Sequence, residues 1–201
     1  MRILLLYWPG ALLESARVPA LALKFQNATL PSLMARTRPA VMDTQTAIAE
    51  VRAVYAELDQ RPVERQCTLR TECCRFKQTG ETPYLTAGEA LLLADALRKR
   101  GQHRIRETND GNCPLLDLKT GRCEAYADRP FGCRTHFCAA AGGPYSRREV
   151  VDLIRRLEDL DHAVGGSGSQ RLGPALRWAL STPSATGKVK AQPMPRARGR
   201  G

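Results

Sequence analysis

The sequence has few aromatic residues, no long hydrophobic run and no glycine-rich nucleotide motif. Phe, Trp and Tyr make up 5% of the 201 residues, which excludes a core built mainly from aromatic packing. The apolar run at residues 3–8 ends at Pro9 and Gly10, far short of a membrane span. No glycine fingerprint marks a nucleotide cofactor. We expect no membrane segment. The sequence shows no Ser/His/Asp or paired-carboxylate pattern, so it does not decide whether the protein is an enzyme.

Cysteine is absent from most of the chain and is concentrated in one stretch of 72 residues. A thiolate is a soft ligand that suits zinc, copper(I) and iron–sulfur units, so this concentration predicts a bound metal that organises the middle of the protein. In a secreted protein an odd number of cysteines would leave one unpaired, whereas a reducing cytosol favours a metal site. We therefore predict a cytoplasmic metal-binding protein whose candidate ligands are Cys67, Cys73, Cys74, Cys113, Cys123, Cys133 and Cys138.

The excess of basic charge lies at the two ends of the chain. Of the net charge of +11, residues 1–41 carry +4 and residues 181–201 carry +5, which leaves +2 for residues 42–180. The central part therefore has no basic footprint for a phosphate backbone. This distribution argues against nucleic acid as a partner, although the basic tail keeps a zinc-finger-like nucleic-acid binder as an alternative.

Composition divides the chain into three parts. Residues 1–41 show no lasting periodicity, so we expect a poorly ordered extension, or a true start codon at Met42. Residues 42–180 form the predicted cysteine cluster metal-binding domain. Residues 181–201 are mostly Pro, Gly, Ala and basic residues, which predicts a disordered basic tail.

Apolar periodicity and capping motifs predict about three helices. The first covers residues 43–59, with Asp43 or Thr44 as its cap. The other two begin at capping boxes, in which a hydroxyl and a glutamate satisfy backbone amides reciprocally: Thr86 with Glu89, and Ser146 with Glu149.

Shorter elements are expected between and after these helices. Residues 115–118 and 122–126 are spaced for a small hairpin, and residues 174–180 for one or two helical turns. The predicted fold is mainly α: a small metal-stapled domain of about three helices around a loop-rich cysteine centre, with one short β-hairpin.

The number and spacing of the thiols leave several ligand sets open. Seven thiolates are more than one tetrahedral site needs and fewer than two all-thiolate sites need. Cys73 and Cys74 would diverge by about 100° on a helix, so either one is not a direct ligand or the two serve a polynuclear centre or separate metals. His136 is an alternative nitrogen ligand. Nearby arginines can balance thiolate charge or donate to sulfur: Arg70, Arg129 and Arg134.

The second half of the cysteine pattern resembles a known family signature. Cys113-Pro-Leu-Leu, followed by Cys123-Glu-Ala-Tyr-Ala-Asp-Arg-Pro-Phe-Gly-Cys133-Arg, is similar to the YkgJ-type cysteine cluster family of zinc- or iron-chelating proteins. The resemblance covers roughly residues 67–140. Arg70 stands where the family's first cluster has a cysteine, and Cys138 is a candidate replacement.

The resemblance implies an iron–sulfur cluster or zinc as the cofactor, and no single reaction. Flagellin lysine methylases carry a related cysteine cluster. An iron–sulfur-dependent enzyme or an accessory factor in protein modification, with a protein partner, is therefore a further alternative.

Overall fold

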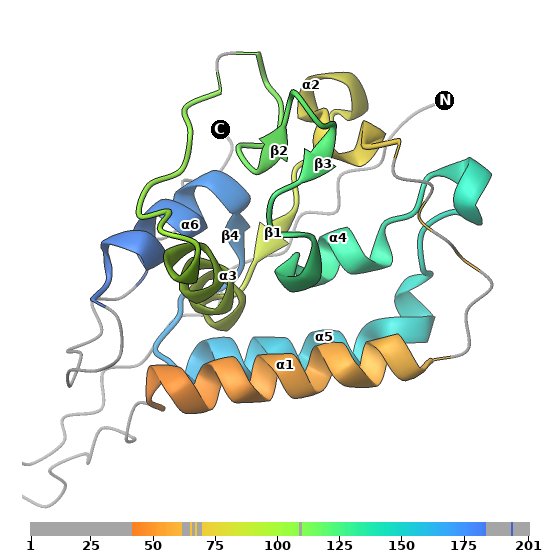
Figure 1. Cartoon of the computed structure of the whole chain (residues 1–201). Helices are drawn as coiled ribbons and strands as arrows, with labels where there is room; N and C mark the ends of the chain where they lie inside the picture. The colour runs from red at the N-terminus through yellow and green to blue at the C-terminus, as the bar shows by residue number, and fades with distance from the viewer. Residues whose placement is uncertain are drawn as a thin grey trace, which may run out of the picture. The chain divides into compact units, whose positions relative to one another are not determined.

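The computed structural model describes residues 42–61, 65, 67, 70–108, 110–183 and 194, which all belong to the unit Pro39–Gly201. The predictions for residues 1–41 and for most of residues 181–201 lie outside the described residues. Helices dominate the described part (Figure 1), which confirms the predicted mainly α fold. Within these ranges, no helix is both long enough and apolar enough to cross a membrane.

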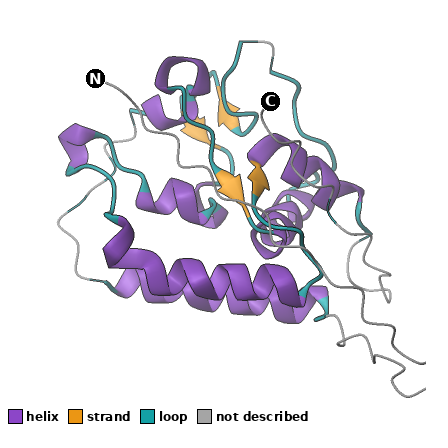
Figure 2. Ribbon diagram, turned by 180° about the vertical axis from the view of Figure 1, so that it is seen from behind, coloured by secondary structure: helices purple, strands orange, loops and turns teal. Residues whose placement is uncertain are grey.

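Four helices form the core. Helix α1 (Thr44–Gln60) lies beside α5 (Arg147–Ala163), and α3 (Ala87–Lys99) packs on both of them and on α6 (Leu172–Ser181), as Figures 1 and 2 show. Helix α3 is central, because every residue from Ala87 to Ala94 is buried. A helix that is apolar on nearly all sides is expected to be enclosed by others.

The three predicted helices are confirmed, and their starts follow the predicted caps. The carboxylate of Asp43 accepts hydrogen bonds from the backbone amides of Gln45 and Thr46, both at 3.0 Å. Both predicted capping boxes form, at the starts of α3 and α5. Helix α6 spans ten residues and is longer than the one or two turns expected.

Two pairs of very short strands connect the helices. Strands β2 (Leu116–Asp117) and β3 (Arg122–Cys123) form the predicted hairpin. Strand β1 (Tyr84–Leu85) pairs with β4 (Gln170–Arg171), which the sequence did not predict because two-residue strands carry no readable periodicity. This second pair brings the start of α6 next to the start of α3.

The cysteines lie outside the four long helices. Cys73 and Cys74 are on η1 (Glu72–Cys74), Cys133 is on α4 (Phe131–Thr135) and Cys123 is on β3. Three further short elements lie along the same part of the chain: α2 (Phe76–Thr79), η2 (Tyr126–Asp128) and η3 (Ala139–Ala141). No residue of η1 or α2, as described, is buried. Cys74 and Phe76 are partly buried against the core, so apolar burial places the first cysteine cluster only in part.

Candidate metal centre

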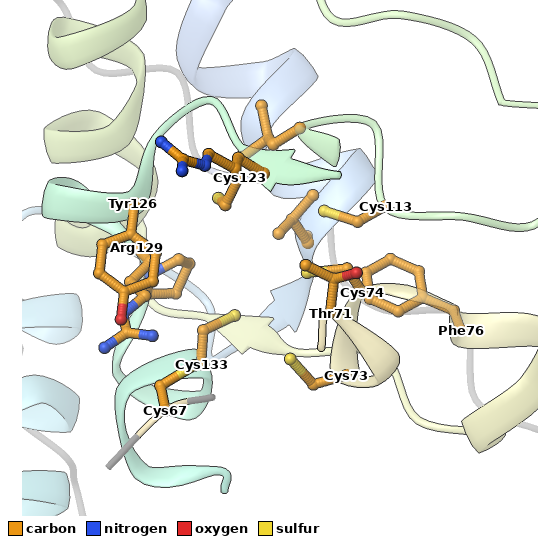
Figure 3. A pocket seen from close by; sticks show the side chains of 14 residues that line it. Cys67, Thr71, Cys73, Cys74, Phe76, Cys113, Cys123, Tyr126, Arg129 and Cys133 are labelled. Atoms are coloured by element: carbon orange, nitrogen blue, oxygen red, sulfur yellow. The ribbon is translucent and has the colours of Figure 1, made fainter. Parts of the chain in front are cut away.

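Six of the seven cysteines surround one cavity of about 420 Å³ (Figure 3). Cys113 is buried, Cys67 and Cys73 are exposed, and the other three thiols are partly buried. No disulfide joins any of the seven cysteines, all of which are described. The structure thus brings together thiols that are up to 66 residues apart in sequence: Cys67, Cys73, Cys74, Cys113, Cys123 and Cys133.

Backbone hydrogen bonds fasten the first cysteine cluster to the segment of Cys113. The amide of Cys113 donates to the carbonyl of Cys74 at 2.7 Å, and the amide of Lys77 donates to the carbonyl of Gly111 at 3.1 Å. Thr71 precedes η1 with a φ of 57°, a left-handed conformation that is uncommon for a residue other than glycine. With this turn, the adjacent Cys73 and Cys74 both line the cavity.

The β2–β3 hairpin positions Cys123. Cys123 pairs with Leu116, and the amide of Glu124 donates to the carbonyl of Leu115 at 2.8 Å. The carboxylate of Asp117 closes the turn by accepting from the amide of Lys119 at 2.9 Å and the hydroxyl of Thr120 at 2.7 Å. A tight turn therefore sets the distance between the segments of Cys113 and Cys123.

Cys133 is positioned by a contact between α4 and the helical core. The amide of Phe131, at the first residue of α4, donates to Oε1 of Glu89 at 2.8 Å, and the hydroxyl of Tyr55 donates to the same oxygen at 2.9 Å. Glu89 is buried, and its second carboxylate oxygen closes the capping box of α3. The sequence predicted only the capping role, although the apolar residues all around α3 signal that Glu89 is enclosed.

Four predicted site residues do not line this cavity among the described residues. Cys138 precedes η3, and His136 is exposed at the end of α4. Arg70 pairs with Glu72 at 2.8 Å on the surface. Arg134 stacks over the ring of Tyr55. Its charge is paired with Asp59, and it also donates to the carbonyls of Ala127 and Arg129.

Four thiols of the cavity have a raised pKa: Cys73, Cys74, Cys123 and Cys133. Contact with Cys113 raises the pKa of Cys74 to about 12, and contact with Cys74 raises the pKa of Cys73 well above its ordinary value. Burial raises the pKa of Cys123 and Cys133. Arg129 opposes these shifts, since its positive charge lowers the pKa of Cys73, Cys123 and Cys133. Metal binding must therefore release protons.

The cavity is larger than one metal ion requires. Its volume corresponds to on the order of ten water molecules at about 30 Å³ each. Four thiolates on a single zinc, at a Zn–S distance of about 2.3 Å, would lie only about 3.8 Å apart. Among the residues that the structure describes, no three His, Cys, Asp or Glu side chains are already gathered in that way. The six thiols in the wall and the volume of the cavity leave room for one metal ion or for a group with several metal atoms.

Comparison with protein families agrees with this donor set. Residues 64–152 match the family CxxCxxCC, described as a putative zinc- or iron-chelating domain. Over these residues the chain is similar to the CxxCxxCC family. The matched range includes all seven cysteines and confirms the resemblance stated from the sequence. Comparison with curated proteins and with solved structures gave no match.

The matched segment departs from the CxxCxxCC family pattern at one position. Arg70 occupies a cysteine position of the family's first cluster, and its side chain pairs with Glu72 outside the cavity. Neither Cys138, the predicted replacement, nor His136, the predicted alternative nitrogen ligand, lines the cavity. All the thiols of the described cavity wall come from the six cysteines other than Cys138. Tyr126 also lines the cavity; it was not predicted as a site residue, although it lies within the family signature.

Proposed function

We propose that the matched segment holds a polynuclear metal centre, an iron–sulfur cluster, with zinc as the alternative metal. The observation that carries the proposal is the arrangement of six thiols around one cavity of about 420 Å³. An iron–sulfur cluster contains several iron and sulfide atoms and needs more room than one zinc ion. The volume of the cavity and the six thiols in its wall support the cluster.

The exposure of two cavity thiols to solvent supports a role in exchange with a partner. A structural zinc site is closed, with four protein ligands and no free position. Here Cys67 and Cys73 are exposed, so one edge of the centre is accessible from solvent. This edge supports a centre that exchanges electrons or metal with a partner. The seven free thiols support a reducing compartment, and we assign the protein to the cytoplasm on that ground.

Anaerobic purification followed by metal analysis, sulfide analysis and a visible absorption spectrum tests the proposal. We expect iron, acid-labile sulfide and a broad absorption band near roughly 400 nm, where thiolate-ligated clusters absorb. Stoichiometric zinc in a colourless protein would mean that the centre holds zinc and not an iron–sulfur cluster. A metal-free protein with oxidised thiols would contradict metal binding altogether.

Two cysteine variants test whether the cavity, rather than thiol content, binds the metal. Cys133 lines the cavity, whereas Cys138 lies five residues away in sequence and outside the cavity wall. We expect C133S to lose most of the metal and C138S to retain the wild-type amount. Equal metal loss in both variants would show that the described cavity is not the binding site. Each variant removes one thiol, which makes C138S a matched control.

A further inference from the structure

One buried hydrogen-bond donor in the cavity wall has no partner within the described part of the chain. Among the described residues, Nε of Arg129 is the buried side-chain nitrogen or oxygen atom for which no hydrogen bond is found. Buried polar groups in folded proteins are nearly always paired, because an unpaired donor loses its hydration without compensation. An unpaired buried guanidinium nitrogen therefore indicates a partner that is not part of the polypeptide.

The position of Arg129 identifies the kind of partner. Arg129 lines the same cavity as the six thiols, and Arg122 is the other charged residue in the described wall, which contains no Asp or Glu. The guanidinium of Arg129 lies over the ring of Tyr126, 4.1 Å from its centroid (Figure 3). This stacking fixes the plane of the guanidinium while leaving its edge available for hydrogen bonds.

The backbone around Arg129 is also held in place. Nε of Arg134 donates to the carbonyl of Arg129 at 3.0 Å, and Asp128 pairs with Arg52 of α1 at 3.2 Å. Arg134 itself is engaged by Asp59 and by backbone carbonyls, so its charge is already matched. Arg122 is exposed and its charge is hydrated. Of the two arginines in the described cavity wall, Arg129 is therefore the one with a buried, unpaired donor atom.

We propose that Arg129 is a positioning residue of the metal centre, whose Nε–H donates to a sulfur atom of the bound centre and whose charge offsets that of the thiolates. The inference rests on the proposed function, because the acceptor is a sulfur of the metal-bound state. Several thiolates around one centre carry net negative charge, and donors aimed at sulfur stabilise the metal-bound form. Arg129 thus makes metal binding more favourable without being a ligand.

The test compares R129Q, R129K and R52Q with the wild-type full-length chain. Each protein is loaded anaerobically with Fe²⁺ and sulfide, or with Zn²⁺, according to the metal analysis described above, and is then challenged with a chelator. R129Q removes the charge and the Nε–H donor, whereas R129K keeps a positive charge with N–H donors at Nζ but removes the Nε–H and the planar guanidinium. R52Q is the matched control, because it removes an exposed arginine whose partner, Asp128, is adjacent to Arg129.

We expect R129Q to weaken metal affinity about 10- to 100-fold, R129K to weaken it less, and R52Q to stay within about twofold of the wild type. The second measurement is the sulfur-to-metal charge-transfer band, read on iron directly or on Co²⁺ in place of zinc. Loss of a donor to sulfur raises the energy of the sulfur electrons, so the band of R129Q should move to longer wavelength. A purely structural role would leave the band unchanged.

The outcomes separate this inference from the proposed function. Wild-type affinity and an unshifted band in R129Q would overturn the role of Arg129 while metal binding itself stands. A wild-type chain that binds no metal would instead contradict the proposed function. Circular dichroism of the metal-free variants checks folding. If R129Q does not fold, the metal affinity and band position of R129K test the role of Arg129 instead.

Discussion

Glu89 connects three helices through a single buried carboxylate. Its oxygens accept hydrogen bonds from Tyr55 of α1, from the amide of Phe131 at the start of α4, and from the amide and hydroxyl of Thr86. Burial raises the pKa of Glu89 above its ordinary value of 4.5, although these donors act in the opposite direction. Burial therefore costs the ionised form more than the hydrogen bonds return.

The raised pKa of Glu89 predicts how stability depends on pH. The folded state holds the Glu89 proton more tightly than the unfolded chain does, so this contribution is fully present below pH 4.5 and is lost as pH rises through the folded pKa. We expect the free energy of unfolding of the wild type to decline relative to that of E89Q over this window. Urea denaturation of the metal-free, reduced proteins at several pH values between 4.5 and 7 measures the difference.

A second variant checks that the pH dependence comes from the carboxyl group of Glu89. Y55F keeps this carboxyl group and removes the phenol that donates to Oε1. Since the phenol favours the ionised form, its loss raises the pKa of Glu89 further and extends the window to higher pH. A difference between wild type and E89Q that is independent of pH would contradict the assignment.

At the scale of elements, the end of α5 is joined to the start of α3 by one buried side chain. The carboxylate of Asp161 accepts from the amide of Ala87 at 2.6 Å and from the amide of Gly168 at 2.8 Å. Asp161 is 1% exposed, and a carboxylate at a helix start favourably meets the positive end of the helix dipole. Gly166 lies against this carboxylate, and a Cβ there would be 2.4 Å from three of its atoms.

We therefore expect G166A to destabilise the protein by about 1–3 kcal/mol, since the added methyl group must displace a carboxylate held by two backbone amides. Thermal unfolding monitored by circular dichroism measures the effect. G173A is the matched control: a Cβ at Gly173 meets only the guanidinium of Arg177 at 3.7 Å, and alanine suits a helix better than glycine. If the two variants unfold at the same temperature, the contact at Gly166 is not rigid.

Apolar spacing and capping residues were sufficient to predict the long helices. The pairing of strands from distant segments could not be predicted from such local patterns. The helices at 43–59 and after Thr86 and Ser146 follow from apolar spacing and caps that lie within a few residues of one another. The pairing of Tyr84 with Arg171 joins segments 87 residues apart and leaves no local signal. Helix α6 was underestimated because Gly173 and Pro174 near its start resemble loop residues.

The candidate site was predictable in residue type and only partly in geometry. Clustered cysteines are sufficient to predict a metal site, but their spacing cannot distinguish Cys133, which lines the cavity, from Cys138, which does not. That distinction depends on a tertiary contact, the hydrogen bond from Phe131 to Glu89. The unpaired Nε of Arg129 also depends on the folded arrangement, since sequence alone does not show which donors are buried.

At the scale of the whole molecule, two parts of the described structure are stabilised differently. Helices α1, α3, α5 and α6 bury a continuous apolar core. The segment of Cys73 and Cys74 buries no residue of η1 or α2 and is attached by a few backbone hydrogen bonds. A metal centre that binds only the folded chain stabilises the segments that supply its ligands.

Removal of the metal should therefore act on one part of the molecule. We expect amide hydrogen exchange at residues 70–80 and 111–135 to accelerate on chelation, by about tenfold or more, while α3 and α6 keep their protection. Mass spectrometry of exchanged peptides, with and without a chelator under reducing conditions, measures this. A uniform change over all helices would instead mean that the centre supports the entire core, and no change would mean that the thiol segments are ordered without metal.

The separation of the cavity's cysteines along the chain affects how the protein is made. Cys133 follows Cys67 by 66 residues, so at synthesis rates of about 5–20 residues per second the first thiols leave the ribosome roughly 3–13 s before the last. During that interval the nascent chain presents reactive sulfur groups that have no complete set of partners. If a metal binds only the complete set of thiols, the early cysteines must stay reduced until the later ones have been made.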